Sequence, residues 1–531
     1  MAAAWISDRL RRETKPLTPD GARSIQGDAR RDAVNQPQPE SIPRSAAYAF
    51  AVQVTTAAFT AVLTLYLVRA LGPSAYGVFA LALATGGLIS VWADLGISPS
   101  TSRFVAERRG DRRAVAAVIS AGFKPKLAAA ALVSVGLFAA SGWIASLYHA
   151  ESLIWPLRAG ALAFFGQTLM LFFQRTFIGQ ARIGPNLRIQ VTESSVETGA
   201  SIALVALGAG ATGAMFGRAA GYLVGGAFAL ALTIRLVGRA AVALGGGLGV
   251  DSRRIIRYAG PLMIVDGAYT VFSQIDAVLI GLLLNTTAVG LFQAPGRLIT
   301  LLGYPGQALA NAVAPRLARQ EGNEPTFKPL TSGIRYLIIV QATLVAPLLV
   351  WAGPIVDLLL GTGYEKSVEV LQILTPYVFL TGISPIVSLA ANYLGIATRR
   401  IPIVLATVAL NVGIDIALIP RIGIIGGAIG TDIAYTFYVV GHLVICKKAI
   451  GLSLRPIAIV LLRATVAVAA MAGVLFAIGT TGLSPADWVI GAVGGSLAYA
   501  AALIVTREVS GAELRLVWNF AERQLPRRAG A

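Results

Sequence analysis

The sequence predicts an all-α integral membrane protein of about fourteen transmembrane helices, arranged as two six-helix lobes and two further C-terminal helices. Three observations predict this fold. The 531 residues are 56% hydrophobic and only 13% charged, the basic residues gather in alternate loops, and the chain repeats itself. A water-soluble domain carries roughly 25% charged residues and has too little interior to hide so much apolar surface. A bilayer accommodates that surface because lipid surrounds it.

Fourteen apolar runs define the expected helices, since a spanning helix needs about 20 apolar residues. The runs lie at 46–68, 75–97, 118–147, 155–174, 189–208, 212–234, 259–284, 288–312, 334–360, 367–396, 401–419, 423–446, 457–479 and 487–506. They divide the chain into a tail (1–45), a first lobe (46–235), a linker (236–258), a second lobe (259–446), an appendage (447–506) and a second tail (507–531). The first tail is polar and lacks an apolar run, so we expect it to be disordered and not a signal peptide.

The basic residues predict the orientation of these helices. Of the 44 Lys and Arg residues, 37 lie in or just beside the two tails and every second loop, whereas the alternate loops hold only Arg69, Lys366 and Arg421. Basic residues stay on the cytoplasmic side of a membrane. The pattern therefore places both termini in the cytoplasm and favours an even number of spans. It also accounts for the net charge of +18 through contacts with anionic lipid heads instead of nucleic acid.

An internal repeat predicts the arrangement of the two lobes. Residues 71–79 (LGPSAYGVF) correspond to residues 284–292 (LNTTAVGLF), and in the same register Arg103 corresponds to Arg316. Each repeat holds six of the expected helices, so both enter the membrane in the same direction. Parallel repeats of this kind are related by an axis along the membrane normal, and a transport site usually lies between them.

The same stretches resemble the polysaccharide repeat-unit flippases of the Wzx type. The resemblance rests on diffuse patterns and covers residues 45–450; examples are VRALGPSAYGVFALAL, QIDAVLIGLLLNTTAVGLFQAPGRL and LNVGIDIALIPRIGIIGGAIGTDIAY. This family belongs to the MOP superfamily, together with the MATE exporters and the lipid II flippases. The resemblance implies two lobes around a cavity in the bacterial inner membrane. It also implies transfer of a polyprenyl-pyrophosphate-linked oligosaccharide to the periplasmic leaflet, with membrane lipids and the polysaccharide polymerase or export machinery as partners.

Burying an ionisable side chain within a membrane costs free energy, so each such residue is expected to have a structural or functional role. Asp276 and Arg297 lie about ten residues before and after the turn at residues 286–287, so both sit ~15 Å below the helix ends. Equal depth on adjacent helices permits an ion pair. The pair either locks this hairpin or supplies Arg297 as a cavity cation for a pyrophosphate. Asp94 and Asp266 are further candidates for the cavity wall.

A second group of ionisable residues lies in the fifth, sixth and twelfth runs. Arg218 stands within Gly217-x-x-x-Gly221-x-x-x-Gly225, which offers a close helix contact, and corresponds to Asp432 in the second repeat. Arg218 is a candidate for the cavity wall. Glu193 and Glu197 are one turn apart on one face and either pair with a neighbouring Arg or hold a proton or Na⁺. Asp432 is a candidate for the same coupling role.

Other functions fit the sequence less well. Cys446 is the only cysteine, and His149 and His442 lie far apart, so we expect neither a disulfide nor a metal site. The glycine-rich stretch 208–213 matches a dinucleotide motif but follows no strand; we expect no cofactor and no enzymatic activity. A MATE-like cation or drug exporter is the main alternative, although the first run contains no Asp or Glu. A polymerase or ligase would need a large outer loop, and a passive membrane scaffold would not need the buried charges.

Overall fold

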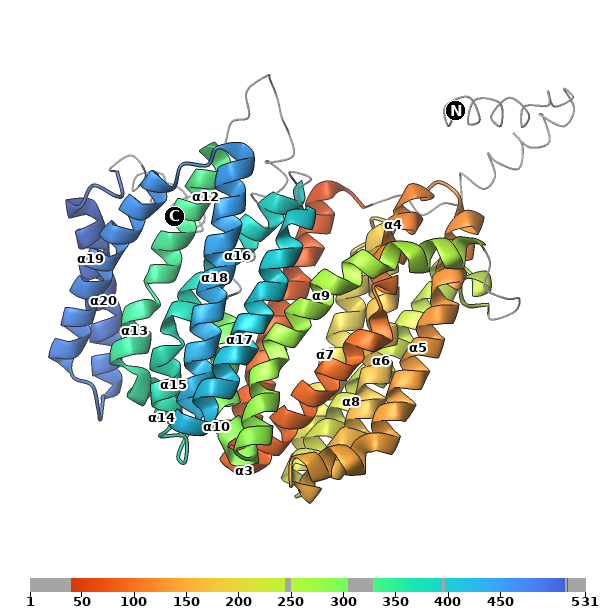
Figure 1. Cartoon of the computed structure of the whole chain (residues 1–531), viewed down its shortest axis with the longest axis horizontal. Coiled ribbons are helices and arrows are strands. Elements are labelled where there is room, and N and C mark those ends of the chain that lie inside the picture. Colours follow the sequence, from red (N-terminus) through yellow and green to blue (C-terminus); the bar gives the residue numbers. More distant parts are fainter. Residues whose placement is uncertain (1–39, 244–249, 304–327, 394–396, 511–512, 514–531) are drawn as a thin grey trace, which may run out of the picture.

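The computed structural model describes residues 40–243, 250–303, 328–393, 397–510 and 513, and these residues form a bundle of helices (Figure 1). The first lobe contains α3 (Ile42–Asp94), α4 (Ile97–Glu107), α5 (Arg112–Leu147), α6 (Ile154–Gly179), α7 (Gly184–Ala206) and α8 (Gly210–Leu236). The second lobe contains α9 (Val250–Leu283), α10 (Thr286–Leu302), α12 (Lys328–Ala342), α13 (Val345–Val350), α14 (Ala352–Leu359), α15 (Ser367–Ile373), α16 (Thr375–Tyr393), α17 (Ile401–Ile422) and α18 (Ile424–Ile450). The appendage contains α19 (Leu454–Ile478) and α20 (Pro485–Val505).

The helices confirm a multi-pass membrane protein. Within the described ranges, nine helices are long and apolar enough to cross a bilayer, or ten if the bent pair α15–α16 is one span. Every expected run falls on one or more helices, although the end of the run 288–312 and the repeat partner Arg316 lie outside the described residues. Fourteen spans therefore stay a prediction.

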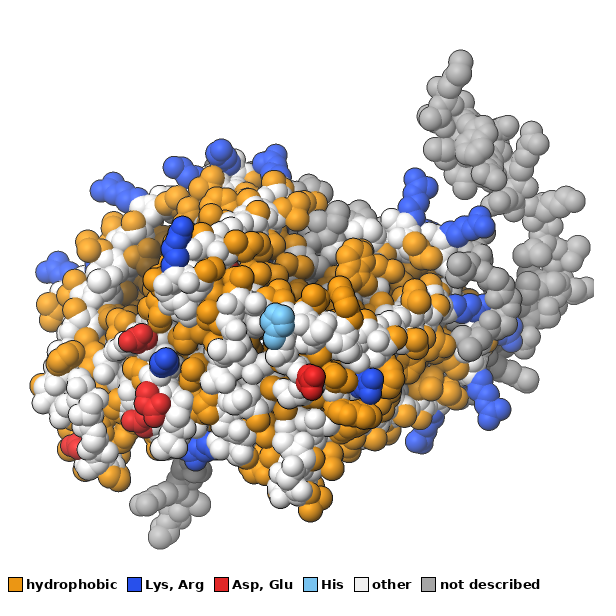
Figure 2. All heavy atoms as spheres, turned by 60° about the horizontal axis from the view of Figure 1, so that its bottom comes forward, with side chains coloured by type: hydrophobic (Ala, Val, Ile, Leu, Met, Phe, Trp, Pro, Cys, Tyr) orange, Lys and Arg blue, Asp and Glu red, His pale blue; other side chains and the backbone are white. Residues whose placement is uncertain are grey.

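Basic side chains gather at one end of the bundle, which we call the basic end. It is the upper end in Figure 1 and carries the turns that precede α5, α7 and α19, which contain or adjoin Arg and Lys. Figure 2 shows the opposite end, where charged side chains are few and apolar surface dominates. This distribution is what the alternation of charge along the sequence predicts.

The first two expected runs form one element, α3, that turns sharply at Gly72. Gly72 has φ 67° and ψ 174°, which a residue with a Cβ atom rarely adopts. Pro73 follows and removes a backbone donor, so the helical hydrogen bonds are interrupted there. The turn lies at the lower edge of Figure 1, where the sequence predicts a short loop at residues 72–74.

Three details differ from the expected helices. The short helix α4 was not expected, because its sequence is rich in serine and threonine and forms no long apolar run. The run 334–360 is divided into α12, α13 and α14, and the run 367–396 bends by 45° between α15 and α16. Pro347 and Pro376 lie in the first turns of α13 and α16. They therefore begin new helices, where a missing N–H costs little.

The two lobes meet at a symmetric glycine contact. A Cβ atom added to Gly77 of α3 would lie 1.8 Å from the carbonyl oxygen of Thr286, and one added to Gly290 of α10 would lie 1.9 Å from the carbonyl oxygen of Pro73. Gly77 and Gly290 are repeat partners, and so are Pro73 and Thr286. Each half thus contacts the other through the same two positions, which is the signature of a twofold relation.

The largest apolar core cluster joins the lobes toward the end opposite the basic end. It combines residues of α3, α5, α6 and α8 with residues of α9, α10, α14 to α16 and α18. A second cluster lies in the basic half of the first lobe and includes Ile255 of α9, a third contains the aromatic side chains of α9 and α18, and a fourth joins the second lobe to the appendage. The lobes are therefore packed together at the end opposite the basic end, and toward the basic end the first half of α9 also contacts the first lobe.

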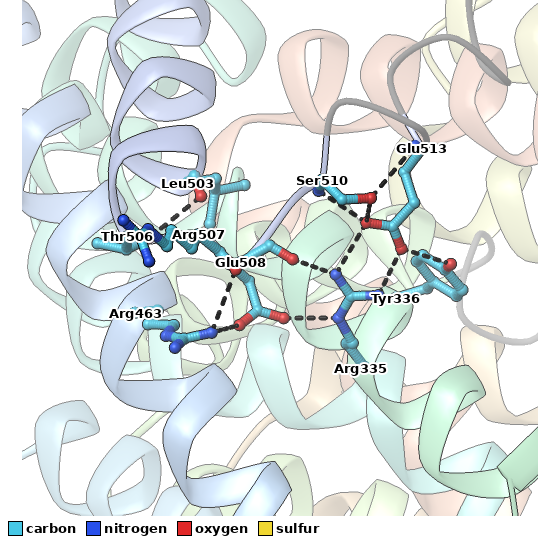
Figure 3. A network of polar contacts seen from close by, with 9 residues as sticks. All are labelled: Arg335, Tyr336, Arg463, Leu503, Thr506, Arg507, Glu508, Ser510 and Glu513. Carbon is cyan, nitrogen blue, oxygen red and sulfur yellow. Dashed lines mark hydrogen bonds and ion pairs between the residues drawn. The ribbon is translucent and has the colours of Figure 1, made fainter.

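A network of ion pairs fastens the appendage to the second lobe (Figure 3). The buried carboxylate of Glu508, just after α20, accepts hydrogen bonds from Arg335 of α12 at 2.6 Å and from Arg463 of α19 at 2.9 Å. Arg335 also binds Glu513 at 2.6 Å. Glu508 thus joins α19 to α12 through Arg463 and Arg335.

Candidate functional site

A cavity of about 1210 Å³ lies between the two lobes. Its wall is formed by α3, α5 and α6 of the first lobe and by α9, α10, α16 and α18 of the second lobe, with Arg400 and Val404 from the start of α17. This volume exceeds the roughly 300–1,000 Å³ of sites for drug-sized ligands. The cavity therefore has room for the head group of a large amphiphile.

The course of α3 shows at which end the cavity is closed. Residues 76–86 are all buried, whereas from residue 87 onward the helix becomes partly exposed. Ser90, Val91 and Asp94, which follow, line the cavity. The closed part coincides with the Gly77–Gly290 contact, so the cavity lies in the half of the bundle nearer the basic end.

The cavity is basic overall. Its described wall carries four basic side chains, Lys126, Arg175, Arg297 and Arg400, against the two acidic side chains Asp94 and Asp276. Lys126 is fully buried and forms an ion pair with Asp94, which also accepts a hydrogen bond from Ser98. Asp94 thus lies at the cavity as expected, but its charge is matched within the first lobe. Of Asp266, only the backbone is described.

Arg297 and Arg175 are the cavity cations that have no carboxylate partner among the described residues. Arg297 is partly exposed and lies beside the buried Tyr76. Arg175 is exposed on α6, facing the cavity from the first lobe. Guanidinium groups present several donors in a plane that matches phosphate. Together these two residues offer an anionic ligand a cation from each lobe.

Three neutral side chains help to hold Arg400 in place. Its guanidinium donates to His442 Nε2 at 3.0 Å, to Ser388 at 2.8 Å and to the hydroxyl of Tyr438 at 3.3 Å. His442 is fully buried and also contacts the carbonyl oxygen of Tyr438. His442 therefore orients a cavity arginine.

Asp276 lies in the cavity wall, but the expected ion pair with Arg297 is not formed between these two described residues. Instead Asp276 accepts a hydrogen bond from Thr431 at 2.5 Å and approaches Asp415 and Asn411 of α17. Asn411 and Asp415 are fully buried, and neither side chain has a hydrogen-bond partner among the described residues. We call these four residues the oxygen cluster. Its hard oxygen ligands suit a proton or a small cation.

Arg218 is bound inside the first lobe and is not part of the described cavity wall. It donates to Glu197 at 2.6 Å and to the Tyr222 hydroxyl at 2.9 Å. Glu193, next to Glu197, accepts from Gln190 at 2.7 Å. One of the two alternatives predicted for these glutamates was an ion pair with a neighbouring arginine. Glu197 forms this ion pair, with Arg218. Gly217, Gly221 and Gly225 of α8 allow this approach, because added Cβ atoms would overlap Ser201, Glu197 and Glu193 of α7.

Asp432 has a local structural partner. Its carboxylate accepts a hydrogen bond at 2.9 Å from the backbone N–H of Tyr377, in the first turn of α16. A carboxylate at this position satisfies a free donor and complements the helix dipole. Asp432 thus fixes the start of α16 beside the cavity.

Several residues of the site were not predicted from the sequence. Arg175 and Arg400 stand at the ends of apolar runs and look like ordinary interfacial residues. Asn411 and Asp415 lie one turn apart on α17, a polar pair within an apolar helix, and this spacing was the available signal. Lys126 lies two turns inside the third expected run and was counted with its basic loop.

Comparisons with known proteins agree with this architecture. The sequence profile described as "Polysaccharide biosynthesis protein" matches residues 42–320. A probable low-salt glycan biosynthesis flippase of Haloferax volcanii is 24% identical over 71% of this chain and 77% of its own length. A putative O-antigen transporter of Escherichia coli K12 is 23% identical over 62% of this chain and 79% of its own length.

Solved structures show the same fold. A lipid II flippase, MurJ, in an inward closed conformation superposes with a TM-score of 0.71 at 13% identity, covering 87% of this chain and 99% of that one. A MATE-family multidrug transporter of the MOP superfamily in an inward-facing conformation gives a TM-score of 0.59 at 16% identity, covering 75% and 96%. At these identities the likeness concerns the fold alone.

Proposed function

Since the chain belongs to the polysaccharide biosynthesis protein family, we propose that it is a flippase for a polyprenyl-pyrophosphate-linked oligosaccharide used in cell-surface polysaccharide synthesis. The observation that carries the proposal is the cavity between two lobes, closed at one end, with a guanidinium group on each wall that has no carboxylate partner among the described residues. An anionic head group is prohibitively costly to bury in a bilayer unless cations meet it. Arg175 and Arg297 supply those cations from opposite sides.

The proposal includes an orientation. The basic end faces the cytoplasm of a bacterial inner membrane, with both termini on that side, because Lys and Arg are retained there. The structure then represents the state that is closed toward the periplasm and receives substrate from the cytoplasmic leaflet. Breaking the Gly77–Gly290 contact and closing the basic end exposes the cavity to the other leaflet. The membrane potential favours export of an anion by about 2.3 kcal/mol per charge and 100 mV.

The composition of the cavity favours this function over a MATE-like exporter of cationic drugs. An organic cation is disfavoured by a net basic cavity, and the described wall holds four basic and two acidic side chains. Asp94 is already paired with Lys126. The relatives whose names state a role are a glycan flippase and an O-antigen transporter, and transport of this kind requires no catalysis by the chain. Contact with a polymerase or an export complex is part of the proposal.

The oxygen cluster is the proposed coupling site. Asp276 and Asp415 lie close together and buried, so they require a compensating positive charge. Asp276 and Thr431 also line the cavity, and a cation bound there is placed to respond to the substrate. Asp415→Asn is expected to remove the dependence of transport on a proton or sodium gradient while head-group binding persists. Unchanged gradient dependence would exclude the cluster from coupling.

The flippase function is tested by replacing Arg297 in cells that lack the native gene. Arg297→Gln keeps a polar side chain and leaves Asp276 with its Thr431 partner. We expect surface polysaccharide to be lost and lipid-linked oligosaccharide to accumulate. The matched control is Arg421→Gln, because Arg421 is exposed at the opposite end and donates only to its own helix in the described structure. Normal export by Arg297→Gln would remove this residue from the substrate site.

A further inference from the structure

The two walls of the cavity differ in chemistry. In the described wall, the first lobe contributes polar, charged and aliphatic side chains and no aromatic one. The second lobe contributes six aromatic side chains, which are Tyr269, Phe272, Phe292, Tyr377, Tyr435 and Tyr438. The internal repeat does not require this asymmetry. It therefore needs an explanation beyond the shared fold.

Four of these aromatic residues form one continuous cluster of ring contacts, and Tyr269 lies beside it. Tyr435 lies at its centre, with its ring centroid 5.6 Å from that of Phe272, 4.8 Å from that of Tyr377 and 5.4 Å from that of Tyr438. Its ring is stacked nearly parallel to those of Phe272 and Tyr438, with interplanar angles of 22° and 14°. Tyr269 stands beside Tyr438 and Tyr377. We call these five residues the aromatic wall.

Polar contacts hold the aromatic wall rigid. The hydroxyl of Tyr435 lies 2.6 Å from the hydroxyl of Ser384, and the hydroxyl of Tyr438 accepts from Arg400. Asp432 fixes the backbone of Tyr377. A wall anchored in this way loses little conformational freedom when a ligand binds, which lowers the entropic cost of binding.

Packing alone does not account for Tyr269. Phe272, Tyr435 and Tyr438 are buried and could serve as ordinary core, whereas Tyr269 is 59% exposed although it lines the cavity. Its ring has no stacking partner among the described residues. A tyrosine in this position presents an apolar face and a polar tip. The neighbouring cavity side chains Thr270, Gln274 and Ser388 add hydrogen-bonding groups.

We propose that the aromatic wall is the sugar-binding surface of the cavity, with Tyr269 as the ring on which a pyranose stacks. This proposal rests on the flippase function. A sugar ring has an apolar C–H face and a rim of hydroxyl groups, which matches tyrosine faces bordered by Thr, Gln and Ser. A polyprenyl tail would instead call for aliphatic side chains, and a planar drug cation is disfavoured by the excess of basic side chains on the described wall. The head group thus divides between the guanidinium groups, which hold the pyrophosphate, and the aromatic wall, which holds the sugars.

The test compares two lipids on the purified full-length protein. The first is undecaprenyl pyrophosphate without sugar; the second is the pool of polyprenyl-pyrophosphate-linked oligosaccharide extracted from the cells in which the gene occurs. The wild type should bind the second lipid more tightly. Tyr269→Ala should reduce that sugar-dependent gain about tenfold while binding of undecaprenyl pyrophosphate stays unchanged. Tyr269→Phe, which keeps the ring, should retain most of the gain.

Phe437→Ala is the matched control, since Phe437 lies on the same helix as Tyr435, is exposed and is not part of the described cavity wall. Two results would refute the sugar-binding surface without refuting the flippase function. One is equal affinity of the wild type for both lipids, and the other is an equal loss of affinity for both lipids in Tyr269→Ala. Failure of the wild type to bind either lipid would overturn the flippase function itself, and the sugar-binding surface with it.

Discussion

The glycine contact between α3 and α10 makes a quantitative prediction about the closed end of the cavity. A Cβ atom at residue 77 would lie 1.8 Å from the Thr286 carbonyl oxygen, where ordinary contact begins at 3.4 Å. The helices must therefore separate by about 1.6 Å, the difference between these distances. Overpacking of this kind costs about 1–3 kcal/mol, and a bias of that size changes a two-state ratio by about 5- to 150-fold. Gly77→Val should accordingly shift the protein from the state closed at this end toward the state open there.

Thiol labelling measures this shift. Cys446 is buried and the only native cysteine, so Gln293→Cys in the cavity wall adds one reactive thiol. In spheroplasts, a membrane-impermeant maleimide should label this thiol faster when Gly77→Val is present. Gly199→Val is the control, because a Cβ atom at Gly199 meets nothing within 4 Å.

Labelling of the same thiol in inside-out vesicles verifies that the Gly77→Val protein is folded. Gly77→Ala, which adds a smaller group, should give an intermediate labelling rate. An unchanged rate in folded Gly77→Val, together with normal transport, would refute the assignment of this contact as the closure of the cavity.

Three further predictions concern the ion pairs. Glu508→Gln should lower the free energy of unfolding in detergent by about 1–3 kcal/mol, because a buried acceptor of two guanidinium groups is weakened; an unchanged thermal midpoint would exclude this network as the link to the appendage. Hydrogen bonds from Arg335 lower the pKa of Glu513, so its contribution is present above the ordinary Glu pKa of about 4.3 and is lost only as the pH falls through the lower folded value. The amide of Ser510 donates to the Glu513 carboxylate, so its protection from exchange, relative to its intrinsic rate, should persist from pH 7 to pH 5, and a loss of protection within that range would contradict the contact. Glu197→Gln should destabilise the first lobe by about 3–5 kcal/mol by leaving Arg218 unmatched, and the added change Arg218→Gln should restore much of it; purely additive losses would show that the two residues act independently.

The helices could be predicted from sequence because the bilayer imposes one dominant rule. Apolar length and the placement of basic residues follow directly from that solvent, and each expected run coincides with helix in the described chain. Breaks within runs were harder to place. Pro347 and Pro376 lie at two of these breaks, but whether a proline bends a helix or begins a new one depends on tertiary packing.

The candidate site was only partly predictable. Counting residues from the turn at 286–287 predicted the depth of Asp276 and Arg297, and both line the cavity. Depth along a helix does not, however, determine which neighbouring helix a side chain faces. Asp276 faces Thr431 and Asp415, which lie more than 130 residues further along the chain. Arg218 shows the same limit, since its partner Glu197 lies on the adjacent helix α7. Spacing in sequence cannot choose among such partners.

The central claim is that this protein moves a lipid-linked oligosaccharide between membrane leaflets. The most direct measurement uses proteoliposomes that contain the purified protein and polyprenyl-pyrophosphate-linked oligosaccharide extracted from the same cells. A periodate reagent that cannot cross the bilayer oxidises only sugars in the outer leaflet. The account predicts that wild-type protein makes the inner-leaflet fraction accessible over time, while Arg297→Gln leaves it protected as in protein-free liposomes. Equal protection with wild-type protein and without protein, under an imposed membrane potential and proton or sodium gradient, would contradict the account.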